Sequence, residues 1–160
     1  MKRVVRIFFG VLVVLIASGQ VICAQSNNEE VDLFQSIFGM QKKAIVGEFL
    51  GIESNNPFWA LYDDYEVKRK ELGKKRLDLL TDYAEHYNNL NDEKYDQIIS
   101  QMISLRKSTD KLMDNYYKKI KKTSGSKLAA QFFQLENFFA SQIRATIMEE
   151  IPYIGEFEKR

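Results

Sequence analysis

Residues 58–87 read FWALYDDYEVKRKELGKKRLDLLTDYAEHY. Aromatic and aliphatic side chains return here in alternating steps of three and four residues, which is the spacing of one face of an α-helix. The stripe comprises Tyr62, Tyr65, Leu72, Leu79 and Tyr83, with Arg69 and Arg76 in the intervening positions. It predicts one long helix that continues through Gly73, although glycine costs about 1 kcal/mol in a helix interior.

The signals that flank this stretch predict where the helix begins and ends. Asn56 is a good N-cap, and Pro57 suits the first helical position, where its missing N–H costs nothing. Residues 88–92 close the helix; within them Leu90 is placed as a hydrophobic staple, and Asn91 or Asp92 as the cap of the next helix. Because this connection is short, the next helix must fold back to form an antiparallel hairpin.

The second half of the hairpin is expected over residues 93–121, with one apolar side. Its members are Tyr95, Ile98, Ile99, Met102, Leu105, Leu112, Met113, Tyr116 and Ile120. A short first helix is expected over residues 31–49, and a fourth helix after a break at residues 123–126, ending before Pro152. The sequence therefore predicts an all-α fold, either a hairpin-based four-helix bundle or a curved helical layer that dimerises.

Residues 1–24 have the pattern of a signal peptide. Three basic residues precede an apolar run over residues 11–17, and Ile22-Cys23-Ala24 offers a cleavage site before Gln25. A retained membrane anchor is the main alternative, but the apolar stretch is shorter than the about 20 residues that a spanning helix needs. Lipid attachment at Cys23 is a further alternative, although Ile22 stands where a small residue is required. We predict an exported protein with a single helical domain over residues 25–160.

Composition and charge exclude several classes of function. The formal net charge of +1 falls to −2 once the three basic residues of the signal peptide are removed, which argues against nucleic acid as a partner. Cys23 is the only cysteine, so residues 25–160 hold no disulfide and no thiol nucleophile. The only histidine, His86, has Asp82 four residues earlier, but two ligands do not make a stable metal site, and a solvent-facing pair is the simpler interpretation. The sequence predicts no catalytic residue, no metal and no cofactor.

Basic residues form the first candidate binding feature. They cluster on both halves of the predicted hairpin, at Lys68, Arg69, Lys70, Lys74, Lys75, Arg76, Arg106, Lys107 and Lys111. An acidic polypeptide, anionic lipid headgroups or polyanionic glycans would suit such a band. The alternative, which is the simpler one, is a solvated face neutralised by the interleaved acidic residues.

Aromatic residues form the second candidate binding feature. Neighbouring aromatics at 132–133 and 138–139 cannot all face inward from one narrow helix stripe, so some must surface as an apolar patch, a dimer seam or a client groove. Packing in the core or a dimer accounts for them more simply than client binding. The candidate binding residues are Phe58, Trp59, Arg69, Arg76, Phe132, Phe133, Phe138 and Phe139.

The segment Phe58-Trp59-Ala60-Leu61-Tyr62-Asp63-Asp64-Tyr65-Glu66 resembles small exported bacterial helical proteins of the Spy and CpxP periplasmic chaperone and stress-sensor group. In those proteins an amphipathic helix, a Leu-Thr-x-x-Gln-like turn and a Phe-Trp-x-x-Tyr-x-x-Tyr segment follow one another. Residues 43–50, 51–56 and 58–65 take those places here, with further likeness at 72–76, 90–94 and 133–137. Neither turn contains Leu-Thr-x-x-Gln itself.

The resemblance implies a periplasmic or secreted protein that binds unfolded polypeptide or an envelope sensor protein without ATP, often as a dimer with a concave client face. We therefore expect an exported, non-enzymatic, chaperone-like protein with no stable membrane insertion after signal cleavage. The alternative is a structural or adaptor protein of the envelope, a homodimer without chaperone activity. A cation-binding protein or enzyme centred on Asp82 and His86 is the least favoured option.

Overall fold

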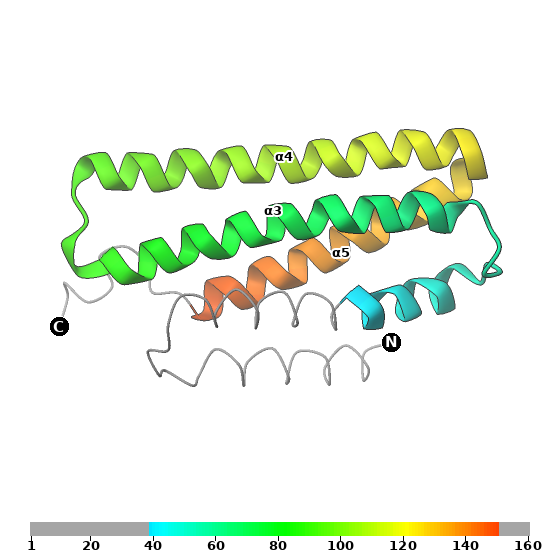
Figure 1. Cartoon of the computed structure of the whole chain (residues 1–160), viewed down its shortest axis with the longest axis horizontal. Coiled ribbons are helices and arrows are strands. Elements are labelled where there is room, and N and C mark those ends of the chain that lie inside the picture. The colour runs from blue at the N-terminus through cyan, green and yellow to red at the C-terminus, as the bar shows by residue number, and fades with distance from the viewer. Residues whose placement is uncertain (1–38, 151–160) are drawn as a thin grey trace. The chain divides into compact units, whose positions relative to one another are not determined.

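The structure, a computed structural model, describes residues 39–150, with side chains to residue 148, and these residues all belong to one compact unit (Figure 1). A helix over residues 39–50 is followed by α3 (Phe58–His86), the short 3₁₀ helix η1 (Tyr87–Asn89), α4 (Asp92–Ser124) and α5 (Ser126–Glu150). No strand occurs between residues 39 and 150, so the predicted all-α fold is confirmed. The predicted signal peptide over 1–24 lies outside the described residues, as do the first eight residues of the predicted helix over 31–49.

The helix ends lie close to those predicted, but α3 begins at Phe58 with Pro57 as its N-cap, one residue later than predicted, and α4 continues three residues beyond the predicted end at Lys121. The Asn56 side chain accepts a hydrogen bond from the Phe58 backbone N–H at 2.9 Å. The Asn91 side chain accepts one from the Lys94 N–H, also at 2.9 Å, which identifies Asn91 as the cap of α4. Gly125 ends α4 with a φ of +89°, a value that favours glycine, and lets the chain turn into α5. The helix α3 is continuous through Gly73, as predicted.

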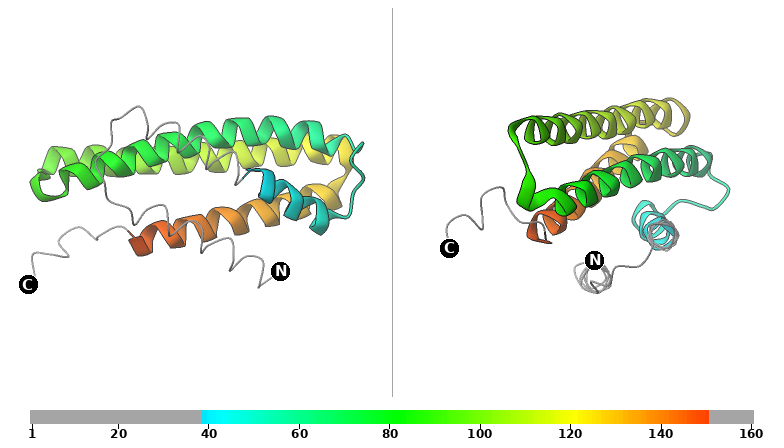
Figure 2. Two further views of the ribbon diagram at one scale, coloured as in Figure 1. Left: turned by 60° about the horizontal axis from the view of Figure 1, so that its bottom comes forward. Right: turned by 60° about the vertical axis from the view of Figure 1, so that its left-hand side comes forward.

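Helices α3 and α4 form the predicted antiparallel hairpin, and α5 returns from the turn at Gly125 (Figure 1). Both further views show that α5 lies beside α4 near this turn and diverges from it toward its C-terminal end (Figure 2). None of the helices between residues 39 and 150 is long and apolar enough to cross a membrane.

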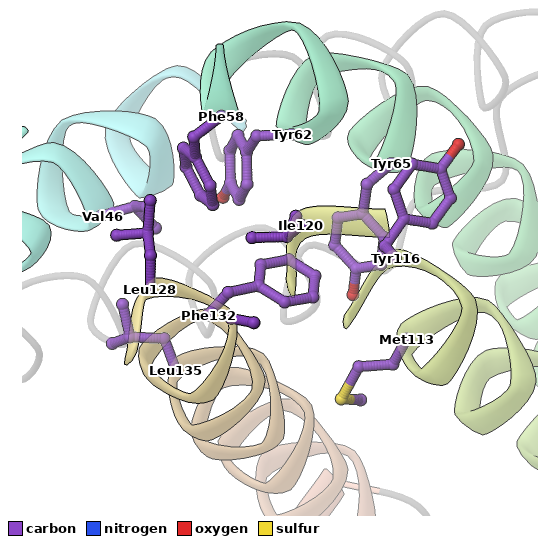
Figure 3. Packing of buried hydrophobic residues seen from close by; sticks show 11 residues of the cluster. Val46, Phe58, Tyr62, Tyr65, Met113, Tyr116, Ile120, Leu128, Phe132 and Leu135 are labelled. Carbon is purple, nitrogen blue, oxygen red and sulfur yellow. The ribbon is translucent and has the colours of Figure 1, made fainter. Parts of the chain in front are cut away.

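The main core lies where all four helical segments meet (Figure 3). Phe132 of α5 packs edge-on against two tyrosine rings of α3, with ring centroids 6.4 Å from Tyr62 and 5.1 Å from Tyr65. The buried residues of this cluster are Val46, Phe58, Tyr62, Tyr65, Met113, Tyr116, Ile120, Leu128, Ala129, Phe132 and Leu135. A smaller cluster of Leu79, Tyr83 and Ile98 holds the hairpin together near η1.

One expectation about α4 is wrong. Ile99 and Met102, which the sequence places on the same apolar side as Ile98, are 44% and 37% exposed. At Met113 and Tyr117 this flank of α4 contacts Asn137 and Phe133 of α5. Ile99 and Met102 lie about three to five helical turns before these contacts. There α5 has diverged from α4, so the apolar side chains on this flank stay exposed.

Candidate functional site

The predicted aromatic binding residues divide between the core and the surface. Phe58 and Phe132 are buried in the main core, so neither presents its ring to a partner. Trp59 is half-buried; its indole N–H donates to the Glu53 carbonyl at 3.0 Å, and the Lys43 ammonium lies 5.3 Å from its ring centroid. Phe133 and Phe138 are the exposed members, at 41% and 43%.

Phe133 and Phe138 emerge on different flanks of α5. Five residues of helix place them about 140° apart around the helix axis. Phe133 faces α4, with its ring centroid 5.8 Å from that of Tyr117, whereas Phe138 packs against Phe139. The prediction that the paired aromatics cannot all face inward is confirmed, but the two exposed rings do not form one patch.

The predicted basic band is partly neutralised. Lys68 pairs with Asp64 at 2.9 Å and also donates to the Tyr116 hydroxyl, while Arg69 pairs with Glu66 at 2.8 Å. Arg76 is half-buried, and its pKa is lowered by burial and by nearby Arg144. Within residues 39–148 no acidic side chain forms an ion pair with the remaining exposed basic residues, namely Lys75, Arg106, Lys107 and Lys111.

Asp82 and His86 form a surface pair, as the simpler interpretation predicted. The His86 Nδ1 lies 3.1 Å from an Asp82 oxygen, and both side chains are exposed. Lys94 binds the other Asp82 oxygen at 2.7 Å, and this bond holds the pKa of Asp82 below its usual range. Among the described residues no three acidic, histidine or cysteine side chains are grouped so that they could hold a metal ion.

A buried charge cluster is the least expected feature of the molecule. Lys42, in the helix over residues 39–50, is 1% exposed. Its ammonium donates to Glu66 Oε1 of α3 and to Glu136 Oε2 of α5, each at 2.7 Å. The helix over 39–50 is therefore attached to two other helices through one lysine.

Three aromatic rings complete the surroundings of this ammonium. Its nitrogen lies 5.7 Å from the ring centroid of Tyr62, 5.6 Å from that of Tyr65 and 5.2 Å from that of Phe139. These distances are within the range of cation–π attraction. The Tyr65 hydroxyl also donates to Glu136 Oε2 at 2.8 Å. We call the set of Tyr62, Tyr65, Glu66, Glu136 and Phe139 the cation cage.

The charges of the cation cage, Lys42 and the adjacent Arg69 balance one another. Arg69 donates to the Glu66 oxygen that also binds Lys42, so two cations face two carboxylates. Burial raises the pKa of Glu66, but Lys42 and Arg69 outweigh it and hold that pKa below its usual range. Burial and the Glu136 charge raise the pKa of Tyr62 and Tyr65, which keeps both phenols neutral.

Some hydrogen-bonding capacity in the cage is unused. The Tyr62 hydroxyl, Glu66 Oε2 and Glu136 Oε1 are buried and have no hydrogen-bond partner within the part of the chain that the structure describes. Buried polar atoms are usually paired, so three such atoms around one ammonium are a feature to be explained.

No protein-family model matches the chain, and no curated protein or solved structure matches it. The likeness to the Spy and CpxP group therefore stays a prediction.

Sequence reasoning missed the cation cage, although each charged member carries a signal. Lys42 lies four residues before buried Val46, Glu66 four residues after Tyr62, and Glu136 four residues after Phe132. Each charge thus shares a helix face with a core residue. That spacing places a charge near the core, but exposed Lys75 stands in the same relation to buried Leu79, so the spacing indicates neither burial nor the partner that neutralises the charge.

Proposed function

We propose that this protein is an exported, non-enzymatic helical protein that binds unfolded polypeptide without ATP, either as a chaperone or as the partner of an envelope sensor protein. One observation carries the proposal: the exposed apolar residues Ile99, Met102 and Ile103, which we call the α4 strip. Their side chains are 44%, 37% and 43% exposed.

The arrangement of the three α4 strip side chains supports a binding surface rather than isolated exposed residues. Spacings of three and four residues put the three side chains on one flank of α4. Contiguous exposed apolar side chains commonly mark interaction sites, whereas isolated ones do not. The flexible thioether of Met102 suits a surface that must accept different sequences.

Basic residues border the strip. Arg106 and Lys107 follow Ile103 on α4, are exposed, and form no ion pair with any residue that the structure describes. Their charge would attract the acidic segments of a client, while the strip would bind its apolar segments. This division of roles needs no catalytic group and no nucleotide.

Suppression of aggregation tests the proposal. A reduced, denatured client is followed by light scattering with and without one equivalent of the mature protein. We expect the wild type to suppress the scattering, and the double variant M102Q/I103K to lose most of that effect. V67Q is the matched control, because Val67 is an exposed apolar residue on α3, outside the strip. Absence of any effect with the wild type would rule out the chaperone function.

A second candidate function is a structural or adaptor homodimer, and the order of charges along α4 favours it. Asp96 precedes the strip, and Arg106 and Lys107 follow it. A second copy packed antiparallel would place the acidic end of one strip beside the basic end of the other, which is the self-complementarity that a two-fold interface requires. Light scattering after size exclusion distinguishes the two candidates. The adaptor function predicts that the wild type is a dimer, that D96K and K107E are each monomeric, and that the double variant D96K/K107E is a dimer again.

A further inference from the structure

The helix over residues 39–50 is held to α3 and α5 by few side chains. Only Lys42 and Val46 of this segment are buried, while Met40 and Phe49 remain exposed. Val46 joins the main core, and Lys42 occupies the cation cage. One ammonium and one aliphatic side chain, four residues apart, are therefore the buried part of the attachment, while Leu50 packs at the edge of the main core and Lys43 pairs with Asp63 at the surface.

We propose that residues 39–50 are an internal ligand, and that the cation cage between α3 and α5 is a binding site for an amphipathic client helix that presents a lysine or arginine in place of Lys42. The inference rests on the proposed polypeptide-binding function and names the chemistry of one class of client segment. The required pattern is a basic residue followed, four positions later, by an aliphatic residue.

The charge of the cage makes it selective for a cation. Without Lys42, the buried cluster retains the two carboxylates of Glu66 and Glu136 and the single positive charge of Arg69. A buried net negative charge is strongly unfavourable, so the site must be refilled by a positive group. The three aromatic rings add a preference for a cation over a neutral side chain.

The unpaired atoms of the cage indicate that Lys42 is an exchangeable ligand. Glu66 Oε2, Glu136 Oε1 and the Tyr62 hydroxyl find no partner among the described residues while Lys42 is bound. An ammonium has three donors, but a guanidinium has five in a planar fork and can engage a carboxylate through two bonds. A client arginine can therefore satisfy oxygens that Lys42 leaves unpaired. The cost of burying charges also offsets much of the attraction that holds Lys42 in place.

A small-molecule probe tests the cation site in the full mature chain. K42A removes a propylammonium group from the cage, so n-propylammonium is added to the variant, with 1-propanol as the neutral probe of equal length. We expect n-propylammonium to raise the melting temperature of K42A and 1-propanol to leave it unchanged. K43A is the matched control, because Lys43 is the neighbouring lysine in an exposed pair with Asp63. Equal responses of the two variants, or of the two probes, would overturn the assignment of a cation site.

A peptide probe tests exchange of the internal ligand in the unaltered protein, and it does not depend on how any variant folds. A labelled peptide of residues 39–52 is titrated into the wild-type chain, beside peptides carrying Lys42→Arg and Lys42→Gln. We expect the first peptide to bind and to accelerate hydrogen exchange in residues 39–50 of the protein. The Arg peptide should bind more tightly, and the Gln peptide at least about 100-fold more weakly, because it lacks the charge-assisted hydrogen bonds to both Glu66 and Glu136. Equal binding of the Lys and Gln peptides, or no binding, would overturn the exchange.

The two proposals fail separately. Suppressed aggregation without peptide binding would leave the chaperone function standing and remove the cation cage as its site. Peptide binding without suppressed aggregation would leave the exchangeable cage standing as a site for specific helical segments, and would remove the general chaperone function.

Discussion

The Lys42 ammonium lies 2.7 Å from Glu136 Oε2, although 94 positions separate the two residues in the chain. This contact joins the helix over residues 39–50 to the last helix of the described chain. Both side chains are almost wholly buried, at 1% and 2% exposure. The contact therefore links the stability of the fold to the attachment of residues 39–50.

Removal of the buried ammonium should be costly. We expect Lys42→Met to lower the free energy of unfolding by about 3–5 kcal/mol, because it leaves two buried carboxylates with one cation. Lys43→Met, in an exposed pair with Asp63, should cost only about 0–1 kcal/mol. Urea denaturation of both variants measures the difference. Equal losses would show that Lys42 is not confined to the cage in solution.

The Lys42 and Glu136 side chains should be energetically coupled. The double variant K42M/E136Q removes one charge of each sign and restores the balance that either single variant breaks. We expect it to be more stable than the sum of the single losses predicts, by about 0.5–3 kcal/mol. A double-mutant cycle from denaturation curves gives this coupling energy. A value near zero would mean that the two groups are screened from one another.

Acid should weaken the fold partly through Glu66. Its pKa lies below the ordinary glutamate value of about 4.3, since the effect of Lys42 and Arg69 exceeds that of burial. A group with a lowered folded-state pKa contributes stability that is complete above its unfolded pKa and is lost as the pH falls through its folded pKa. The urea midpoint should therefore decline below about pH 4.3, and the decline should be shallower in Glu66→Gln. Parallel profiles of the two proteins would contradict the assignment.

The two tyrosines of the cage should respond differently to loss of their hydroxyls. The Tyr65 hydroxyl donates to Glu136 at 2.8 Å, so Tyr65→Phe should cost about 1.5–3 kcal/mol. The Tyr62 hydroxyl has no partner among the described residues, so Tyr62→Phe should be neutral or stabilising. Thermal unfolding of the two single variants compares them directly. A larger loss in Tyr62→Phe would show that its hydroxyl has a partner in solution.

Much of the fold could be predicted because its determinants are local. The spacing from Tyr62 to Tyr83 defines α3, Asn56 accepts from the first N–H of α3 although Pro57 is the N-cap, and Asn91 caps α4 as predicted. These features involve residues within a few positions of one another, where helix geometry relates sequence distance to spatial distance. The same reasoning placed the antiparallel hairpin.

The exposure of apolar residues could not be predicted in the same way. Ile98 and Ile99 are neighbours in sequence, yet one is buried against α3 and the other is exposed. The difference depends on the direction that α5 takes after Gly125, and the periodicity of α4 does not contain that direction. Phe132 and Phe133 are also neighbours, and the sequence predicted only that such paired aromatics cannot all face inward; the packing of α5 buries Phe132 and leaves Phe133 41% exposed beside Tyr117.

By itself the sequence determined the helical class of this protein, the limits of its long helices and the hairpin, because capping and 3.6-residue periodicity act over a few residues. Only the tertiary structure decided that Lys42 neutralises Glu66 and Glu136. These three charges come from three helices that are far apart in the chain. In the low-dielectric interior each charge needs a partner of opposite sign, and local sequence patterns do not predict which distant residue that partner is.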